Sequence, residues 1–187
     1  MHLNTFYKNS FSCTSVGTYF NAIDVLTVYG MTLDDVTPVY QSFGDSTESL
    51  KDNKIDAAFV VAGAPTTSIV ELSTAKQAYL VSIDDDHIAK LIAMSPYYSK
   101  HIIPADAYGL DTDTQTVAVA AMVLARDDAS EDAIYAFTSS IFNGAADIQH
   151  AKAADLDVNF ASSIDSVPFH PGAAKFYEEQ GITVATK

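Results

Sequence analysis

The stretch IDAAFVVAGAPTTSIVELSTA, residues 55–75, indicates the fold class. Residues 55–63 form an almost continuous apolar run, which is typical of a strand in a parallel sheet that is covered on both faces. Pro65 follows at the expected first turn of a helix, where the N–H group that proline lacks would be unpaired anyway. The stretch therefore predicts a strand followed by a helix, which is the repeating unit of an α/β protein.

Helix and strand signals also alternate around this stretch, up to about residue 103. The predicted elements are a helix over 18–29 ended by Gly30, a short helix opened by a capping box of Asp45 and Glu48 and ending near Asn53, a strand over 78–83, and a helix over 84–94 stopped by Pro96. Together they predict a small, mostly parallel sheet flanked by helices.

The remainder of the chain follows a different pattern. Residues 104–115 combine Pro, Gly and Asp and are expected to form a hinge. Beyond it we expect an apolar strand over 116–125, a helix opened by a capping box of Asp128 and Glu131 and ended by Asn143 and Gly144, a helix over about 145–155, and a last helix with Pro171 at its first position and Gly181 just past its end. The strand over 116–125 has no neighbour in the sequence to pair with, so another segment or chain is expected to complete it.

Composition excludes several classes of partner. The 187 residues carry a formal net charge of −14, which argues against nucleic acid and anionic membranes because both would be repelled. No stretch has the length of a membrane span, and the N-terminal residues show no export signal. The single cysteine, Cys13, is expected to be a buried thiol.

No strong catalytic, cofactor or metal motif is present, so an enzyme is not expected. The acids of Asp84–His87 are expected to cap a helix, and Asp111 and Asp113 lack the Gly and Glu of a calcium loop. Because His101, His150 and His170 have no partner at ligand spacing, they are expected to be surface or capping residues.

Two predicted helix starts are candidate anion sites. One carries Thr18 and Asn21, and the other follows Ala62 and Gly63 and includes Pro65 and Thr66. Unpaired N–H groups and the helix dipole favour a negative group at such positions. Ordinary capping is the alternative, because Ser, Thr and Asn are common at helix starts.

Five segments, in this order, resemble the TAXI family of TRAP-transporter solute receptors between Ser15 and Gly181. They are GTYFNAIDVLTVYGMTLDDV (17–36), SFGDSTESLKDNKIDAAFVVAGAPT (42–66), HIIPADAY (101–108), TVAVAAMVLARDDASEDAIYAFTSSIF (116–142) and HPGAAKFYEEQGI (170–182). The resemblance implies an α/β fold of the periplasmic-binding-protein type II, with one lobe and a partial second lobe.

The resemblance also implies where the ligand binds. Gly17, Thr18 and Asn21 fit the glycine-rich turn that caps a helix at the ligand cleft, whereas Ser15 and Val16 depart from it. Val16 replaces a usual Ser, a loss expected to weaken binding by about 1–3 kcal/mol if the ligand group stays buried. The implied ligand-binding residues are Ser15, Gly17, Thr18, Asn21, Ala62, Gly63, Ala64, Pro65 and Thr66.

By the same resemblance, residues 1–103 form the ligand-binding lobe (lobe two), 104–115 the hinge, and 116–187 the returning strand and helices of an incomplete lobe one. The family's first lobe begins upstream of this chain, so the chain is expected to be truncated at its N-terminus. Residues 1–14 do not match the strand expected before the glycine-rich turn.

The implied function is capture of a small carboxylate, such as glutamate or a dicarboxylate, for a TRAP membrane permease in the periplasm. No cofactor, metal or nucleic acid is expected. The alternative is a truncated remnant or assembly piece that does not bind solute and associates through its exposed lobe-one strand, for instance as a homodimer.

Overall fold

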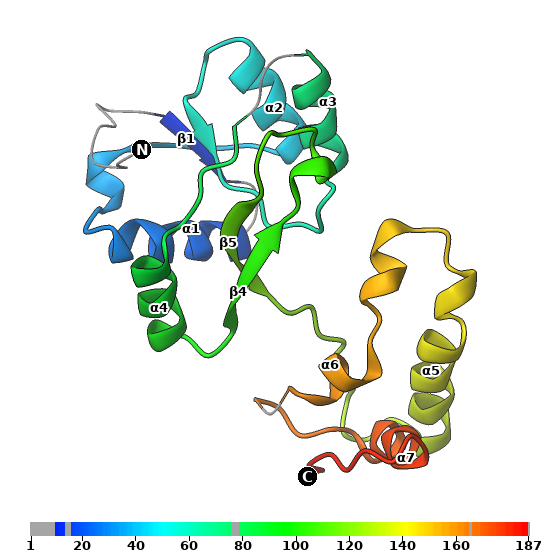
Figure 1. Ribbon diagram of the computed structural model, residues 1–187. Helices are drawn as coiled ribbons and strands as arrows, with labels where there is room; N and C mark the ends of the chain where they lie inside the picture. Colours follow the sequence, from blue (N-terminus) through cyan, green and yellow to red (C-terminus); the bar gives the residue numbers. More distant parts are fainter. Residues whose placement is uncertain (1–9, 14–15, 76–78, 165, 187) are drawn as a thin grey trace. The chain divides into compact units, whose positions relative to one another are not determined.

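The computed structural model describes residues 10–13, 16–75, 79–164 and 166–186 (Figure 1). The chain divides into two compact units, Met1–Ala120 and Ala121–Lys187. Each unit is described by itself, and the assignment of residues 1–103 and 116–187 to two lobes of a receptor stays a prediction.

The first unit contains a three-stranded parallel sheet with strand order β2-β1-β3. Its strands are β1 (Ser10–Cys13), β2 (Thr37–Tyr40) and β3 (Ala57–Ala58), and its helices are α1 (Val16–Val28), the 3₁₀ turn η2 (Leu33–Asp35), α2 (Phe43–Lys51) and α3 (Thr67–Ala75). This arrangement confirms the predicted α/β class and agrees with the fold of a periplasmic-binding-protein lobe.

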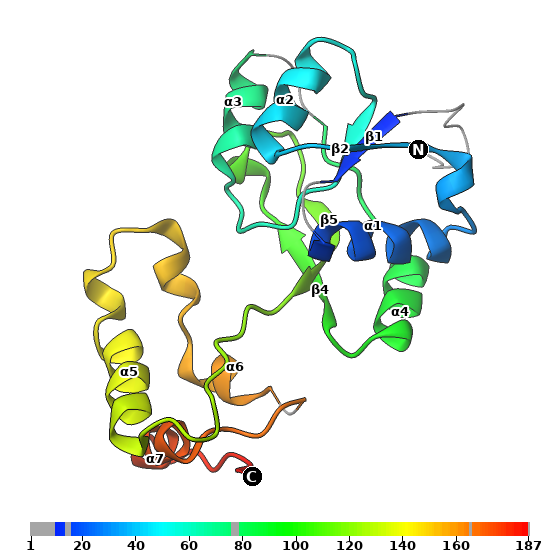
Figure 2. The ribbon, with the colours of Figure 1, turned by 180° about the vertical axis from the view of Figure 1, so that it is seen from behind.

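Helices cover both faces of this sheet (Figures 1 and 2). Phe11 and Cys13 project from β1 into a core with Ala22 and Leu26 of α1. On the opposite face the hydroxyl oxygens of Ser12 and Ser46 lie 2.7 Å apart and join β1 to α2. The strand β1 is therefore packed on both of its faces.

Two sequence-based expectations about these strands need correction, and one strand was not predicted. Residues 10–13 do form a strand directly before α1, so the expected mismatch over 1–14 is wrong for this part. The predicted strand over 55–63 reduces to Ala57–Ala58, and β2 was not predicted. Strands of two to four residues are too short to show a period of two.

A second, two-stranded antiparallel sheet completes the first unit. It pairs β4 (Tyr98–Ile103) with β5 (Thr114–Val119), and the 3₁₀ turn η3 (Ala105–Ala107) lies between them. The expectation that this strand lacks a partner is therefore wrong for residues 114–119, whereas residues 120–126 continue without regular structure. Of the strand predicted over 78–83, the described part forms no ladder. Ile83 bonds to β5 through its N–H, which donates to the Gln115 carbonyl (2.9 Å), and through its carbonyl, which accepts from Gln115 Nε2 (2.9 Å).

Most helix ends agree with prediction, but three helix starts do not. Gly30, with φ of 73°, closes α1, and α4 (Asp85–Met94) begins after Asp84. The hydroxyl groups of Ser42 and Ser130 cap α2 and α5, so neither Asp45 nor Asp128 is the capping residue. A serine hydroxyl in this position accepts from the third helical N–H and therefore satisfies one unpaired donor.

Pro65 is the third difference. The helix α3 begins at Thr67, and the carbonyl of Thr66 accepts from the N–H groups of Ile69 and Val70. Pro65 therefore precedes the helix instead of occupying its first turn, and the Ala64–Pro65 bond is cis. The turn between β3 and α3 is accordingly longer than the sequence suggested.

The second unit is built mainly from two packed helices, α5 (Glu131–Asn143) and α7 (Pro171–Glu179). Its other elements are the short helix α6 (Val158–Ser162) and the 3₁₀ turns η4 (Ala145–Asp147) and η5 (Ala151–Asp155), which replace the single helix predicted over 145–155. As predicted, Pro171 is the first residue of α7, and Gly181 follows it with φ of 76°.

Candidate functional site

The parallel sheet brings the two predicted turns to one edge. Because β1 and β3 are adjacent and parallel, the segments that follow them leave the sheet at the same, carboxyl edge. The start of α1 follows β1, and residues 62–66 follow β3 and lead into α3. Ligands of open α/β sheets bind at this edge. We refer to the start of α1 and the turn over 62–66 together as the carboxyl-edge site; Ser15 lies outside the described residues.

At the start of α1, the predicted residues differ in their exposure. Gly17 is exposed, whereas Thr18 is buried against the unit. Asn21 donates from Nδ2 to the Tyr98 hydroxyl oxygen over 2.6 Å, and that hydroxyl donates to the Asp24 carboxylate over 2.7 Å. The Asn21 amide is therefore held by the protein itself.

Burial raises the pKa of Tyr98 to about 12, and the hydrogen bond and charge of Asp24 act in the same direction. The Asn21 hydrogen bond opposes them, because a donor favours the ionised phenolate. The Tyr98 hydroxyl consequently keeps its proton at neutral pH and donates it to Asp24.

In the second turn, Ala62, Gly63 and Pro65 are exposed, and Ala64 and Thr66 are half-buried. The Thr66 N–H donates to the Tyr108 hydroxyl oxygen over 2.9 Å, and the Tyr108 hydroxyl lies 3.3 Å from Thr66 Oγ1. The Thr66 hydroxyl donates in turn to the Gly63 carbonyl over 2.9 Å. The turn is thus fixed by a side chain from the loop after β4.

Sequence reasoning missed four residues near this edge. Tyr98 and Tyr108 contact α1 and the second turn across long stretches of chain, and no local pattern marks them. Gln41 and Ser68 each have a buried side-chain atom, Nε2 and Oγ, without a hydrogen-bond partner among the described residues. Gln41 directly follows β2, so recognising that strand would have indicated it.

Aromatic side chains lie beside the start of α1. The Tyr19 ring lies 5.5 Å from that of Phe20 and 6.0 Å from that of Tyr40, measured between ring centroids. Phe20 is 58% exposed and Tyr40 65% exposed. This side of the edge therefore presents apolar surface to solvent next to a helix start.

The N-terminal ends of α1 and α3 offer backbone hydrogen-bond donors at the carboxyl edge. The first N–H groups of a helix have no partner within the helix, so α1 and α3 both direct donors toward the carboxyl edge. Cys13 is buried, as predicted, and its burial raises the pKa of the thiol. Within the part of the chain that the structure describes, no three His, Cys, Asp or Glu residues are grouped to hold a metal ion.

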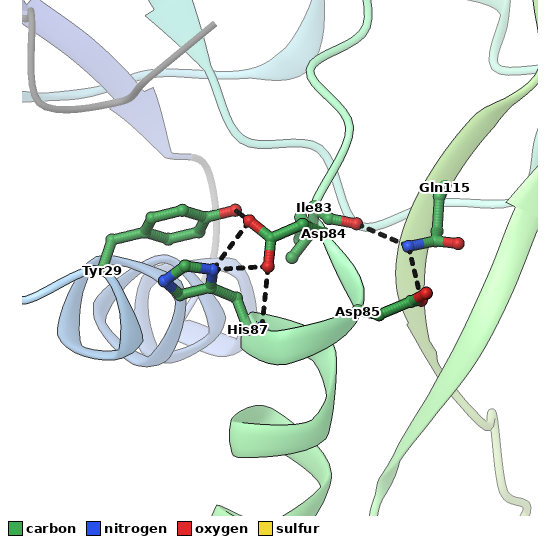
Figure 3. A network of polar contacts seen from close by, with 6 residues as sticks. All are labelled: Tyr29, Ile83, Asp84, Asp85, His87 and Gln115. Carbon is green, nitrogen blue, oxygen red and sulfur yellow. Dashed lines mark hydrogen bonds and ion pairs between the residues drawn. The ribbon is translucent and has the colours of Figure 1, made fainter.

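The acidic stretch before α4 has the capping role that was predicted (Figure 3). Asp84 accepts from the His87 N–H over 3.1 Å and lies 2.7 Å from His87 Nδ1, and these bonds from His87 lower the pKa of Asp84. The His87 ring stacks on Tyr29 with 3.7 Å between centroids. Asp85 is bonded to Lys100 and Gln115, and these bonds, chiefly that of Lys100, lower its pKa.

The remaining polar candidates also have local roles. Asp113 accepts from the Ala105 N–H over 2.9 Å, and so stabilises the turn between β4 and β5. His150 and His170 cap η5 and α7, as predicted, and His101 is exposed on β4. None of the helices in the described ranges is both long enough and apolar enough to span a bilayer.

Comparison with known protein families finds a match that covers both units. The model of the NMT1-like family matches residues 3–181, which is nearly the whole chain. The match includes the start of α1, the turn over 62–66 and the helices of the second unit.

Proposed function

The chain belongs to the NMT1-like family, whose members are TAXI-type solute receptors of TRAP transporters, and we propose that it captures a small carboxylate for uptake. The family is one of solute-binding proteins and not of enzymes. The carboxylate, the permease partner and the periplasmic location are parts of the proposal.

The convergence of two helix starts on one sheet edge is the observation that carries this proposal. The start of α1 and the start of α3 follow adjacent parallel strands, so the N-terminal ends of both helices lie at the same edge. A carboxylate accepts hydrogen bonds from the first N–H groups of a helix and is favoured by both helix dipoles. Glutamate and dicarboxylates of similar size are the solutes we propose.

Three lysines of the first unit form ion pairs with carboxylates of the same unit. Lys51 and Lys54 pair with Glu48 and Asp52, in and after the last turn of α2, and Lys100 pairs with Asp85. Backbone recognition of an anion needs no cationic side chain. It therefore fits a chain with a formal net charge of −14.

In the proposed mechanism, solute binding favours a closed state of a two-lobed receptor, because solute contacts more donors in that state. The closed receptor delivers its solute to the TRAP permease. The proposed ligand contacts are Gly17 and Thr18 of α1 and Ala62, Gly63, Ala64 and Pro65 before α3. Ser15 remains a proposed contact from the sequence alone. Asn21 and Thr66 are also proposed contacts. The Asn21 side-chain amide donates to Tyr98, and the Thr66 N–H donates to Tyr108.

A matched pair of variants at Thr67 tests this function. Thr67 is the first residue of α3, where proline is tolerated but removes the N–H, whereas alanine retains it. In a thermal-shift screen with L-glutamate, 2-oxoglutarate and succinate, we expect the wild type and Thr67→Ala to be stabilised by at least one compound. Thr67→Pro should lose most of that shift. A wild type that none of the three stabilises contradicts the proposal.

Exposed apolar residues after β5 favour a second function, association with another copy of this chain. Val123 is 73% exposed and Leu124 74% exposed, in a segment without regular structure. Contiguous apolar surface of this kind is typical of interaction sites. Light scattering should then show a dimer that the double variant Val123→Ser/Leu124→Ser converts to a monomer. A monomeric wild type contradicts this second function.

A further inference from the structure

We propose that Tyr108 is a positioning residue of the solute site, and that its hydroxyl sets the conformation of the turn over 62–66. This inference rests on the proposed function for its link to solute binding. Its structural part rests on three hydrogen bonds that connect Tyr108, Thr66 and Gly63.

The protons of these three bonds can be assigned without conflict. The Thr66 hydroxyl donates to the Gly63 carbonyl, so its oxygen is available to accept from the Tyr108 hydroxyl. The Tyr108 oxygen in turn accepts from the Thr66 N–H. Each hydroxyl therefore donates once and accepts once, and the turn is closed by a short cycle of bonds.

The Tyr108 side chain is itself held firmly in place. It is 7% exposed and follows η3, in the loop between β4 and β5. The Ala105 carbonyl accepts from the Leu110 N–H over 2.9 Å, and the Ala105 N–H donates to Asp113 over 2.9 Å. Gly109, with φ of 65°, permits the sharp turn directly after Tyr108. The hydroxyl position is thus set by the β4–β5 loop.

The consequence for solute concerns the residues after Thr66. Because Tyr108 occupies the Thr66 N–H, that donor is not available to a solute. The next N–H groups, those of Thr67 and Ser68, start α3 and remain without partners within the helix. Tyr108 therefore acts on solute through the orientation of these groups, without touching solute itself.

Hydrogen–deuterium exchange of the full chain tests the structural part. Tyr108→Phe removes only the hydroxyl, so we expect the Thr66 amide to exchange about tenfold faster or more, while α1 and α4 keep their protection. Tyr135→Phe is the matched control, because Tyr135 also donates its hydroxyl to a partner, Glu179, but in the second unit. Unchanged exchange at Thr66, or faster exchange throughout the first unit, would overturn the positioning role.

A titration with L-glutamate then separates this inference from the proposed function. If Tyr108 positions the site, Tyr108→Phe weakens glutamate binding about tenfold, and Tyr135→Phe leaves the affinity unchanged. Equal affinity of Tyr108→Phe and wild type would overturn the link between Tyr108 and solute. Absence of carboxylate binding by the wild type would contradict the proposed function, whereas the exchange result still decides the role of Tyr108 in the turn.

Discussion

Tyr98 connects α1 to β4 through a single hydroxyl group. It accepts a hydrogen bond from Asn21 and donates one to Asp24, and it is buried beside Ile83, Ile88 and Leu91. Ionisation would place a phenolate next to the Asp24 carboxylate in a poorly solvated position. The pKa of Tyr98 therefore rises from 10.0 to about 12.

This shift predicts a loss of stability at alkaline pH. A pKa that is higher in the folded than in the unfolded chain stabilises the fold fully below the unfolded pKa of 10.0, and this contribution is lost as pH rises through about 12. The free energy of unfolding, measured with urea at several pH values across this range, should fall more steeply with pH for the wild type than for Tyr98→Phe. Tyr97→Phe, at an exposed neighbouring position, should behave like the wild type. If the free energy of unfolding fell equally with pH in all three proteins, the role of Tyr98 would be contradicted.

Residues of the site could be predicted from sequence only where the signal is local. Thr18 and Thr66 lie within two residues of helix starts, which hydroxyl residues commonly mark, so both helices could be predicted to within about two residues of where they begin. Tyr98 bonds to Asn21 of α1 over a separation of 77 residues, and Tyr108 bonds to Thr66 in the second turn over 42 residues. Contacts at such separations leave no periodic pattern in a single sequence.

At the scale of elements, helices were predictable and short strands were not. Gly30 and Gly181 adopt positive φ at helix ends, a conformation that glycine favours, so the ends of α1 and α7 could be located. Ser42 and Asp45 are both residues common at helix starts, and only the structure shows that Ser42 accepts the capping bond. β2, with four residues including Pro38, gives no periodic signal.

The packing of α5 against α7 depends on Gly172. A Cβ at this position would overlap the Glu131 carbonyl oxygen and lie 3.0 Å from the Tyr135 backbone nitrogen. Backbone atoms cannot move aside as a side chain can, so α7 would have to shift away from α5. The aromatic contacts of Phe142 with Phe176 and Tyr177, which join the same helices, would be lost or weakened.

We therefore expect Gly172→Ala to destabilise the second unit by about 1–3 kcal/mol or more. Gly44→Ala is the matched control, because a Cβ at position 44 of α2 would meet only Ser42 Oγ, at 3.9 Å. That substitution should be neutral or stabilising by up to about 1 kcal/mol, since alanine favours helix. Thermal unfolding followed by circular dichroism measures both effects. A Gly172→Ala protein as stable as the wild type would refute the predicted close packing.

At the scale of the whole molecule, the chain divides after Ala120, in a segment without regular structure. The segment includes Arg126, the single arginine of the chain, which is exposed and ion-paired with Asp128. Residues 104–113 of the predicted hinge lie between β4 and β5, and residues 114–115 begin β5, all within the first unit. Pro, Gly and Asp residues are common both in the loop between two strands and in linkers between domains, so composition alone does not distinguish the two.

An arginine-specific protease can test this division. Exposed segments without regular structure are preferred sites of cleavage, so the native chain should be cut rapidly after Arg126 into fragments 1–126 and 127–187. Mass spectrometry identifies the fragments, and Arg126→Gln provides the uncut control. If the native wild type resisted the protease while the urea-unfolded chain was cut, the segment would not be accessible as the structure indicates.

We propose that a small carboxylate binds where α1 and α3 begin. The most direct test is a nitrogen–proton NMR titration of the full chain with L-glutamate and with succinate, which reports each backbone N–H separately. We expect saturable shifts concentrated at the N–H groups of residues 16–20, 62–64 and 66–69, with smaller changes at Tyr98 and Tyr108. Shifts centred elsewhere, or none with either compound, would contradict this proposal.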